Sequence, residues 1–335
     1  MFPPEFDYYR ATSVEEALEL LETHADVDSA LLAGGHGLLP DAKTGEAAPE
    51  VAIDIAGIDA LRGVEKAESF DSAKAGDSDD SGQAVSPVAI GALTTHVTVS
   101  ESDAVAAVAP VLAEAAGEVG DVQVRNRGTI GGNLAEADPA ADLPAAMIAA
   151  DATLVVRGRD GEREVPADQF FQDAGGTDLG DRELLTDIRV PGTEADDGDA
   201  VPAAGGAYAK KTHPATGYAL VGVAASLRIA DRTVTDARLA ASGVADGPVR
   251  LTAVEESLAA EDVLVGGDPD RDALAAAAER AGETLDPAEV RSDVAASGEF
   301  RLHLLESYAE RALSTALDRV QSGACRARRL GGGDR

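Results

Sequence analysis

Residues 124–144 read VRNRGTIGGNLAEADPAADLP, and this stretch decides how the N-terminal part of the chain is interpreted. Its centre is Thr129, Ile130, Gly131, Gly132 and Asn133. Glycine has no Cβ, so successive backbone N–H groups can point the same way and a phosphate can approach closely. The flanking hydroxyl and amide side chains can bind phosphate or sugar oxygens. Because glycines and prolines interrupt it, we expect the whole stretch to be loop.

A second glycine pair lies upstream, where residues 33–40 read AGGHGLLP directly after a short apolar run. The candidate cradle consists of Ala33, Gly34, Gly35, His36 and Gly37. One glycine pair alone is better explained as a tight turn. Two pairs in one domain favour opposed cradles that bind the oxygens of a diphosphate without cationic side chains. Neither stretch matches G-x-G-x-x-G, so a nicotinamide dinucleotide is not indicated.

Asp142 follows the second glycine pair and has two possible roles. Its carboxylate could accept hydrogen bonds from a sugar-alcohol chain of the same ligand. It could also cap the helix that contains Pro144. The two roles can coexist.

The charge balance excludes several classes of partner. Against 61 acidic residues the chain has 28 basic ones, for a net charge of −33. Such a surface repels nucleic acid and anionic membranes. The acids are dispersed along the chain and lysine is scarce, which is typical of a protein from a salt-loving host, where salt screens the repulsion.

The chain offers few metal or cluster ligands. Its single cysteine, Cys325, cannot hold an iron–sulfur cluster, which needs about four thiolates. The five histidines are too scattered to predict a zinc site. No apolar run is long enough for a membrane helix and the start does not resemble a signal peptide, so we expect a cytoplasmic protein without a membrane span.

The first part of the chain, residues 1–192, is expected to be α/β. Ser13 and Glu16 predict a capping box that opens a helix. A polar acidic loop is expected at about 66–85. The other expected elements are strands at Ala30–Ala33, Val51–Ile55 and Val88–Leu93, helices at Asp103–Val119 and Leu143–Ala150, and a hairpin of Ala152–Val156 with Glu162–Val165 across Asp160 and Gly161.

Residues 191–206 have the Pro, Gly and Asp content of a connection between domains. The second domain, residues 200–320, is expected to be α+β, followed by a flexible tail at 321–335. Its expected strands are Ala207–Lys211, Tyr218–Ile229 and Val234–Ser242, and its expected helices are Val254–Ala260, Asp272–Arg280 and Phe300–Val320. The last helix would place Phe300, Leu304, Tyr308, Ala312 and Leu313 on one face.

Several motifs together carry a family resemblance. AGGH, VRNRGTIGGNLA and ADPAADLP, in this order and spacing, resemble the FAD-binding medium subunit of the molybdenum hydroxylases, the family of carbon monoxide and xanthine dehydrogenases. FPPEFDY, IGALTTH and GEFRLHL extend the resemblance over most of the chain. It implies a PCMH-type FAD-binding domain of two α/β subdomains, followed by a domain with a three-stranded antiparallel sheet and helices.

The resemblance also implies roles for residues. FAD would be held non-covalently, with residues 33–37 and 129–133 around the diphosphate and Asp142 at the ribityl chain. Leu185 would touch the flavin ring, Tyr208 would lie against it and Lys210 would be the lysine of the flavin pocket. A cation there would stabilise the anionic reduced flavin. The plainer alternatives are a solvated strand-end charge for Lys210 and an ordinary core position for Tyr208.

Three residues stand out from the family pattern. Gly37 occupies a position where serine is common, which removes a hydroxyl donor, and Glu136 adds a negative charge near the second glycine pair. His36 is ambiguous, because related stand-alone oxidases attach flavin covalently to a histidine in a similar loop.

The resemblance implies an electron-transfer subunit with no catalytic residue of its own. It would work with a molybdenum-cofactor large subunit and a [2Fe–2S] small subunit, as a dimer of heterotrimers. The alternative is a self-contained FAD oxidase of an alcohol or sugar, which needs a general base over the flavin. A scaffold that has lost its cofactor is a third possibility, against which the intact glycine pairs argue. The sequence leaves the substrate and the electron acceptor open.

Overall fold

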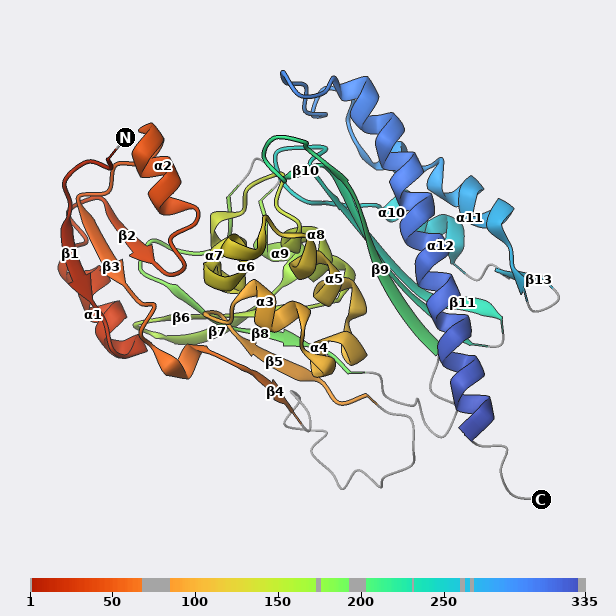
Figure 1. Cartoon of the computed structure of the whole chain (residues 1–335), viewed down its shortest axis with the longest axis horizontal. Helices are drawn as coiled ribbons and strands as arrows, with labels where there is room; N and C mark the ends of the chain where they lie inside the picture. The colour runs from red at the N-terminus through yellow and green to blue at the C-terminus, as the bar shows by residue number, and fades with distance from the viewer. Residues whose placement is uncertain are drawn as a thin grey trace.

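The chain folds into three units that lie side by side in the computed structural model (Figure 1). The structure describes residues 2–67, 85–172, 176–192, 203–230, 232–259, 263–265 and 268–330. Most of the expected acidic loop and of the connection at 191–206 lies outside the described residues, as does Asp231 in the turn expected at 230–232. Each unit has its own cluster of buried apolar side chains.

The N-terminal unit is a small parallel sheet with helices. Its elements are β1 (Asp7–Arg10), α1 (Val14–Thr23), β2 (Ser29–Leu32), α2 (Leu38–Thr44) and β3 (Val51–Asp54), and the sheet order is β1-β3-β2. Ser13 caps α1 as expected, because its hydroxyl accepts from Glu16 N at 3.1 Å. The reciprocal hydrogen bond of the expected capping box is shifted by one residue, because Glu16 Oε2 accepts from Thr12 N, at 2.7 Å, and not from Ser13 N. A short turn of helix, η1 (Asp59–Leu61), leads into the next unit.

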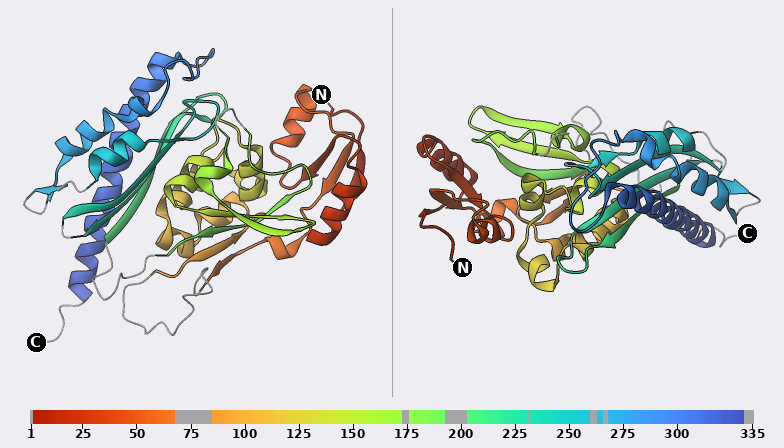
Figure 2. Two further views of the ribbon diagram at one scale, coloured as in Figure 1. Left: turned by 180° about the vertical axis from the view of Figure 1, so that it is seen from behind. Right: turned by 90° about the horizontal axis from the view of Figure 1, so that it is seen from above.

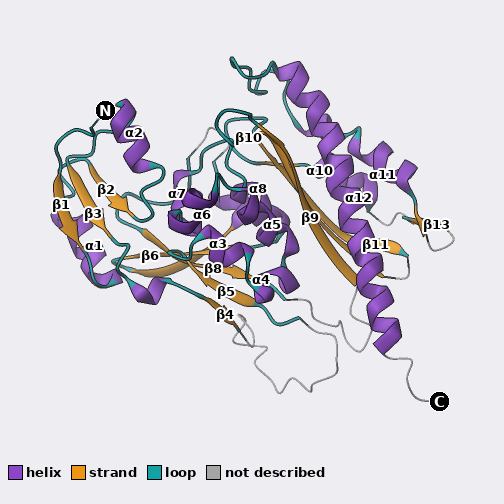
Figure 3. Cartoon of the chain, viewed as in Figure 1, coloured by secondary structure: helices purple, strands orange, loops and turns teal. Residues whose placement is uncertain are grey.

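The central unit places helices against a five-stranded antiparallel sheet, of order β4-β5-β8-β6-β7 (Figure 3). The strands are β4 (Val64–Lys66), β5 (Val88–Gly91), β6 (Thr153–Gly158), β7 (Gly161–Pro166) and β8 (Leu184–Val190). The helices are α3 (His96–Ser100), α4 (Asp103–Val108), α5 (Pro110–Glu118), α6 (Val122–Arg127), α7 (Ile130–Glu136), α8 (Leu143–Ala149) and α9 (Ala167–Phe170).

The stretch expected to be loop contains two helices, α6 and α7, so that expectation was wrong. Asp121 starts α6, because its Oδ1 accepts from Gln123 N at 2.8 Å and from Val124 N at 2.9 Å. Thr129 starts α7 in the same way, accepting from Gly132 N at 3.2 Å. A capping side chain satisfies the free N–H groups of a first turn. That gain outweighs the low helix propensity of the glycines.

Two other expectations for this unit need small corrections. The helix expected at 103–119 is interrupted at Ala109, and Pro110 begins the next helix. Proline lacks the N–H that a continuous helix would need there. The hairpin turn consists of Arg159 and Asp160, since Gly158 pairs with Gly161.

The C-terminal unit is an antiparallel sheet covered on both faces. Its strands are β9 (Ala203–Thr212), β10 (Ala219–Ala230), β11 (Thr233–Ser242) and the short β12 (Val249–Arg250), in the order β12-β11-β10-β9. The long helix α12 (Gly298–Leu330) packs on one face, and α5 and α8 of the central unit pack on the other (Figure 2). The remaining elements are α10 (Thr252–Leu258), β13 (Leu264–Val265), β14 (Asp268–Pro269), α11 (Arg271–Ala278) and η2 (Ala281–Thr284).

Helix α12 differs from the expectation in its end and in its rotation. It continues through Leu330 instead of ending at Val320, and a single glycine at 323 does not break it. Phe300 is exposed, whereas Leu305 and Ala309 face the sheet. The cause is Arg301, which is buried and donates to Leu220 O at 2.6 Å and Gly243 O at 2.8 Å, so it sets the rotation of the helix. Among the described residues, no helix is long and apolar enough to cross a membrane.

Candidate cofactor-binding site

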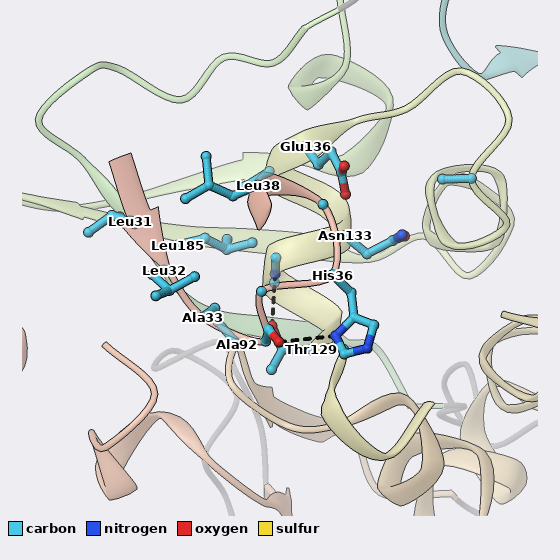
Figure 4. Close-up of a pocket in the computed structure, with 18 of the residues that line it drawn as sticks. Leu31, Leu32, Ala33, His36, Leu38, Ala92, Thr129, Asn133, Glu136 and Leu185 are labelled. Carbon is cyan, nitrogen blue, oxygen red and sulfur yellow. Dashed lines mark hydrogen bonds between the residues drawn. The ribbon is translucent and has the colours of Figure 1, made fainter. Parts of the chain in front are cut away.

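A cavity of about 770 Å³ lies where the three units meet. This volume is within the usual range for sites that hold small molecules and cofactors. Figure 4 shows leucines of β2 to one side of the cavity and His36, Asn133 and Glu136 to the other. Of the residues proposed from the sequence, it is lined by Ala33, Gly34, Gly35, His36, Gly37, Thr129, Gly131, Gly132, Asn133, Asp142 and Leu185.

The first glycine loop follows β2 and ends at Gly37, which caps α2. Gly35 has φ +74°, a left-handed conformation that glycine adopts without steric cost. His36 donates from Nδ1 to Gly34 O at 3.0 Å, since a carbonyl can only accept. A Cβ on Gly34 would overlap the carbonyl oxygen of Arg127. The first loop therefore packs directly against the residues that precede the second.

The second glycine pair lies in the first turn of α7. A Cβ on Gly131 would lie 2.5 Å from the Cβ of Ala92, so this glycine is required for close packing. A Cβ on Gly132 would lie 2.8 Å from Thr129 Oγ1 and in ordinary contact with Ala33 Cβ at 3.8 Å, on one side of the cavity. Ile130 is fully buried in the central core and does not line the cavity. The N–H groups of this turn already have partners, because Ile130 N and Gly131 N donate to Thr94 O and Ala92 O and Gly132 N donates to Thr129 Oγ1, so the turn offers a ligand its open side rather than free donors.

Asp142 joins the cavity to the C-terminal unit. Its Oδ1 accepts from the Tyr208 hydroxyl at 2.6 Å and its Oδ2 from Lys210 Nζ at 2.9 Å. Lys210 also donates to Glu118 O at 3.0 Å, and the side chains of the ion pair are 3% and 4% exposed. Asp142 occupies the cap position of α8, but its side chain makes no capping hydrogen bond, so that role is excluded.

The environment of Asp142 shifts its protonation. Burial raises the pKa of Asp142 to about 6, and the neighbouring Lys210 limits the increase. Burial and the Asp142 carboxylate together raise the pKa of Tyr208, which keeps it a hydrogen-bond donor. Tyr208 and Lys210 do not line the cavity. From outside the cavity, they hold the Asp142 carboxylate in place.

Tyr218, rather than Tyr208, is the tyrosine that lines the cavity. It follows Gly217, whose φ is +78°, in the turn before β10, and its side chain is 41% exposed. Burial by the cavity walls raises its pKa to about 12. Sequence reasoning treated Tyr218 only as the start of a strand. The glycine that precedes it was the one signal that it lies in a turn.

Two buried polar atoms of residues around this cavity lack partners in the part of the chain that the structure describes. They are His96 Nδ1 and Asn133 Oδ1, and both residues line the cavity. Burial lowers the pKa of His96 to about 4, so its ring is neutral near pH 7. Buried polar groups normally have partners. A ligand with hydroxyl and phosphate oxygens on one side and an apolar ring beside Leu185 fits this cavity.

A glycine-rich backbone loop, the open side of Gly132 and an apolar wall are features expected of a site for a nucleotide cofactor. The comparisons with known proteins identify the family. Residues 4–76 and 79–193 match the FAD binding domain in molybdopterin dehydrogenase, and residues 206–316 match the CO dehydrogenase flavoprotein C-terminal domain. The chain belongs to the FAD-binding medium subunits of the molybdenum hydroxylases.

Relatives agree over nearly the whole chain. The medium chain of carbon monoxide dehydrogenase from Hydrogenophaga pseudoflava is 36% identical over 94% of this chain and 98% of its own. The glyceraldehyde dehydrogenase medium chain of Sulfolobus acidocaldarius is 35% identical over 77% of this chain and 82% of its own. The carbon monoxide dehydrogenase structure from H. pseudoflava superposes with a TM-score of 0.80, covering 95% of this chain and 99% of that one. The expected family, fold class and FAD cofactor are confirmed.

Proposed function

We propose that this chain carries electrons within a molybdenum hydroxylase complex, taking them from [2Fe–2S] clusters on a partner subunit and passing them to an external acceptor. The observation that carries the proposal is the cavity between the glycine loops, in a chain with one cysteine. A cluster needs about four thiolates, so the clusters belong on another chain. The partners are then a [2Fe–2S] small subunit and a molybdenum-cofactor large subunit, in a dimer of heterotrimers in the cytoplasm.

Different residues of the cavity hold different parts of FAD. The N–H groups of residues 34–37 bind the diphosphate, which lies against the open side of Gly132, and Asp142 orients the ribityl chain. Leu185 and Tyr218 flank the ring. FAD, when bound, can exchange electrons singly or in pairs, which suits the junction between one-electron clusters and a two-electron acceptor. Binding is non-covalent, as the resemblance to the medium subunits implies; His36 donates from Nδ1 to Gly34 O, so its Nε2 is the nitrogen that a covalent bond would use.

The test uses the full chain with and without its two partner subunits. We expect acid precipitation to release yellow flavin, and stopped-flow absorbance to show flavin reduction only when the partners and their substrate are present. Tyr218→Ala should slow reduction more than Tyr208→Phe, because only Tyr218 lines the cavity. Bleaching of the isolated chain by an alcohol, sugar or aldehyde would instead establish the self-contained oxidase, and colour left in the pellet would indicate a covalent bond.

A further inference from the structure

Glu136 reaches across the cavity from the second glycine loop to the first. It is the last residue of α7, whose first turn holds Gly131 and Gly132. A Cβ on Gly37 would overlap both carboxylate oxygens of Glu136, so the carboxylate occupies the space that a side chain at position 37 would need. Glu136 lines the cavity and is labelled at its upper edge in Figure 4. The position of the Glu136 carboxylate therefore depends on glycine at position 37.

The surroundings of this carboxylate contain no cation that could stabilise it. Within the described ranges Glu136 has neither an ion pair nor a side-chain hydrogen bond. The ionisable groups that act on it are Asp41 of α2 and Asp138 of the loop after α7, and Tyr218 faces it from the C-terminal unit. Glu136 is exposed to the water of the cavity, although atoms of both glycine loops surround its carboxylate. This partial burial, with Asp138 and Asp41, raises the pKa of Glu136 to about 7.

An anionic cofactor makes the ionised form still less favourable. Two like charges near each other in a site of low effective dielectric repel strongly, and the group that can take up a proton does so. A protonated carboxyl group can also donate a hydrogen bond, whereas a carboxylate can only accept. Phosphate oxygens and the main-chain carbonyls of the loop are both acceptors.

We propose that Glu136 takes up one proton from solvent when FAD binds, so that a neutral carboxyl group closes the cofactor site against Gly37. The inference rests on the proposed binding of the FAD diphosphate by the two glycine loops. The balance is one carboxylate, one solvent proton and one FAD giving one carboxylic acid and one bound FAD. Affinity for FAD then falls as pH rises, by up to about tenfold per pH unit above roughly 7.

Isothermal titration calorimetry of the full chain with FAD tests this, with the partner subunits present if flavin retention requires them. Titrations between pH 6.5 and 8.5 at fixed molar salt, in buffers of different ionisation enthalpy, count the protons taken up. At pH 8 we expect close to one proton per FAD. Glu136→Gln should abolish the uptake and make the affinity independent of pH. The exposed Glu101, in the turn after α3, provides the control Glu101→Gln, which should behave as wild type.

A double-mutant cycle of Gly37 and Glu136 tests the contact between these two residues, so the test does not depend on a single variant. Gly37→Ala alone should push the carboxylate into the cavity and weaken FAD binding at least tenfold at pH 7.5. Adding Glu136→Ala should restore most of the affinity, because coupled neighbours are not additive. Wild-type FAD binding with no proton uptake and no pH dependence, or additive effects in the cycle, overturns the inference while leaving the proposed function intact. Failure of every form to bind FAD overturns the proposed function itself.

Discussion

The two glycine pairs are alike in sequence and different in structure. Gly34 and Gly35 form an irregular loop in which one residue has a left-handed backbone, whereas Gly131 and Gly132 lie inside a helix. In the first loop glycine is needed for conformation and for contact with the neighbouring backbone. In the second loop, Gly131 lets the first turn of α7 pack against Ala92 at the end of β5, and Gly132 leaves one side of that turn open. Similar motifs therefore respond differently to the same substitution.

The largest effect is expected for Gly132→Val, on the open side of the second loop. A branched side chain would fill the space proposed for the diphosphate, so FAD affinity should drop by roughly fivefold to a hundredfold, given about 1–3 kcal/mol per overlap and tenfold per 1.4 kcal/mol. The fold should survive, because the Thr129 hydroxyl can rotate away at the cost of one capping hydrogen bond at the start of α7. Flavin absorbance and circular dichroism measure the two effects. Gly117→Val, in α5 and away from the cavity, is the matched control, because a Cβ there would make only an ordinary contact with Ser100 Cβ at 3.8 Å. Unchanged flavin content in Gly132→Val would contradict the assignment.

Gly34→Ala should act on stability more than Gly132→Ala does. Its methyl group would overlap a backbone carbonyl that cannot rotate away, so the two loops must separate, at a cost of about 1–3 kcal/mol of unfolding free energy. Urea denaturation at fixed salt would measure the difference. Equal stabilities of the two alanine variants would show that the loops do not differ as described.

The pH dependence of stability should show the effect of Glu136, which contacts the first glycine loop at Gly37. The pKa of Glu136 is raised to about 7, so between its unfolded value and 7 the folded protein binds more protons than the unfolded chain. The contribution of Glu136 to stability is thus largest at low pH and falls as pH rises through this window. Asp142 and Asp187 have the same sign and titrate near 6, whereas His96, whose pKa is lowered to about 4, has the opposite sign, so the difference in slope between wild type and Glu136→Gln reports Glu136. Between pH 6.5 and 7.5, Glu136→Gln should make the slope of the melting temperature against pH less negative; an unchanged slope would argue against the raised pKa.

Salt should raise the stability of variants in either glycine loop by the same amount, so it is expected to produce the smallest difference between the loops. With a net charge of −33, stability of the whole chain should rise from low to molar salt as repulsion between carboxylates is screened. Differential scanning calorimetry of the wild type and the glycine variants should give parallel increases. A melting temperature independent of salt would refute the proposed halophilic adaptation.

Sequence reasoning identified the two loops and Asp142, because glycine pairs and their spacing are visible in one dimension. It missed the helices around the second loop, since the capping side chains of Asp121 and Thr129 outweigh the glycines between them. Tyr208 was assigned to the flavin ring through the family resemblance, and Tyr218 was not considered as a site residue. Tyr208 and Lys210 are two apart in a strand and so share a face. Which face meets the cavity depends on how the sheet packs on α5 and α8, a tertiary contact that no local pattern encodes.

The link between Asp142 and the pair Tyr208 and Lys210 has a consequence for how such subunits can diversify. The carboxylate belongs to the FAD-binding domain and both of its partners belong to the C-terminal domain. A recombination event that exchanged one domain alone would leave a buried charge without its counter-charge, a loss of about 3–5 kcal/mol. The two domains are thus expected to be inherited as one unit, and chimaeras between distant relatives should be viable only when all three residues come together.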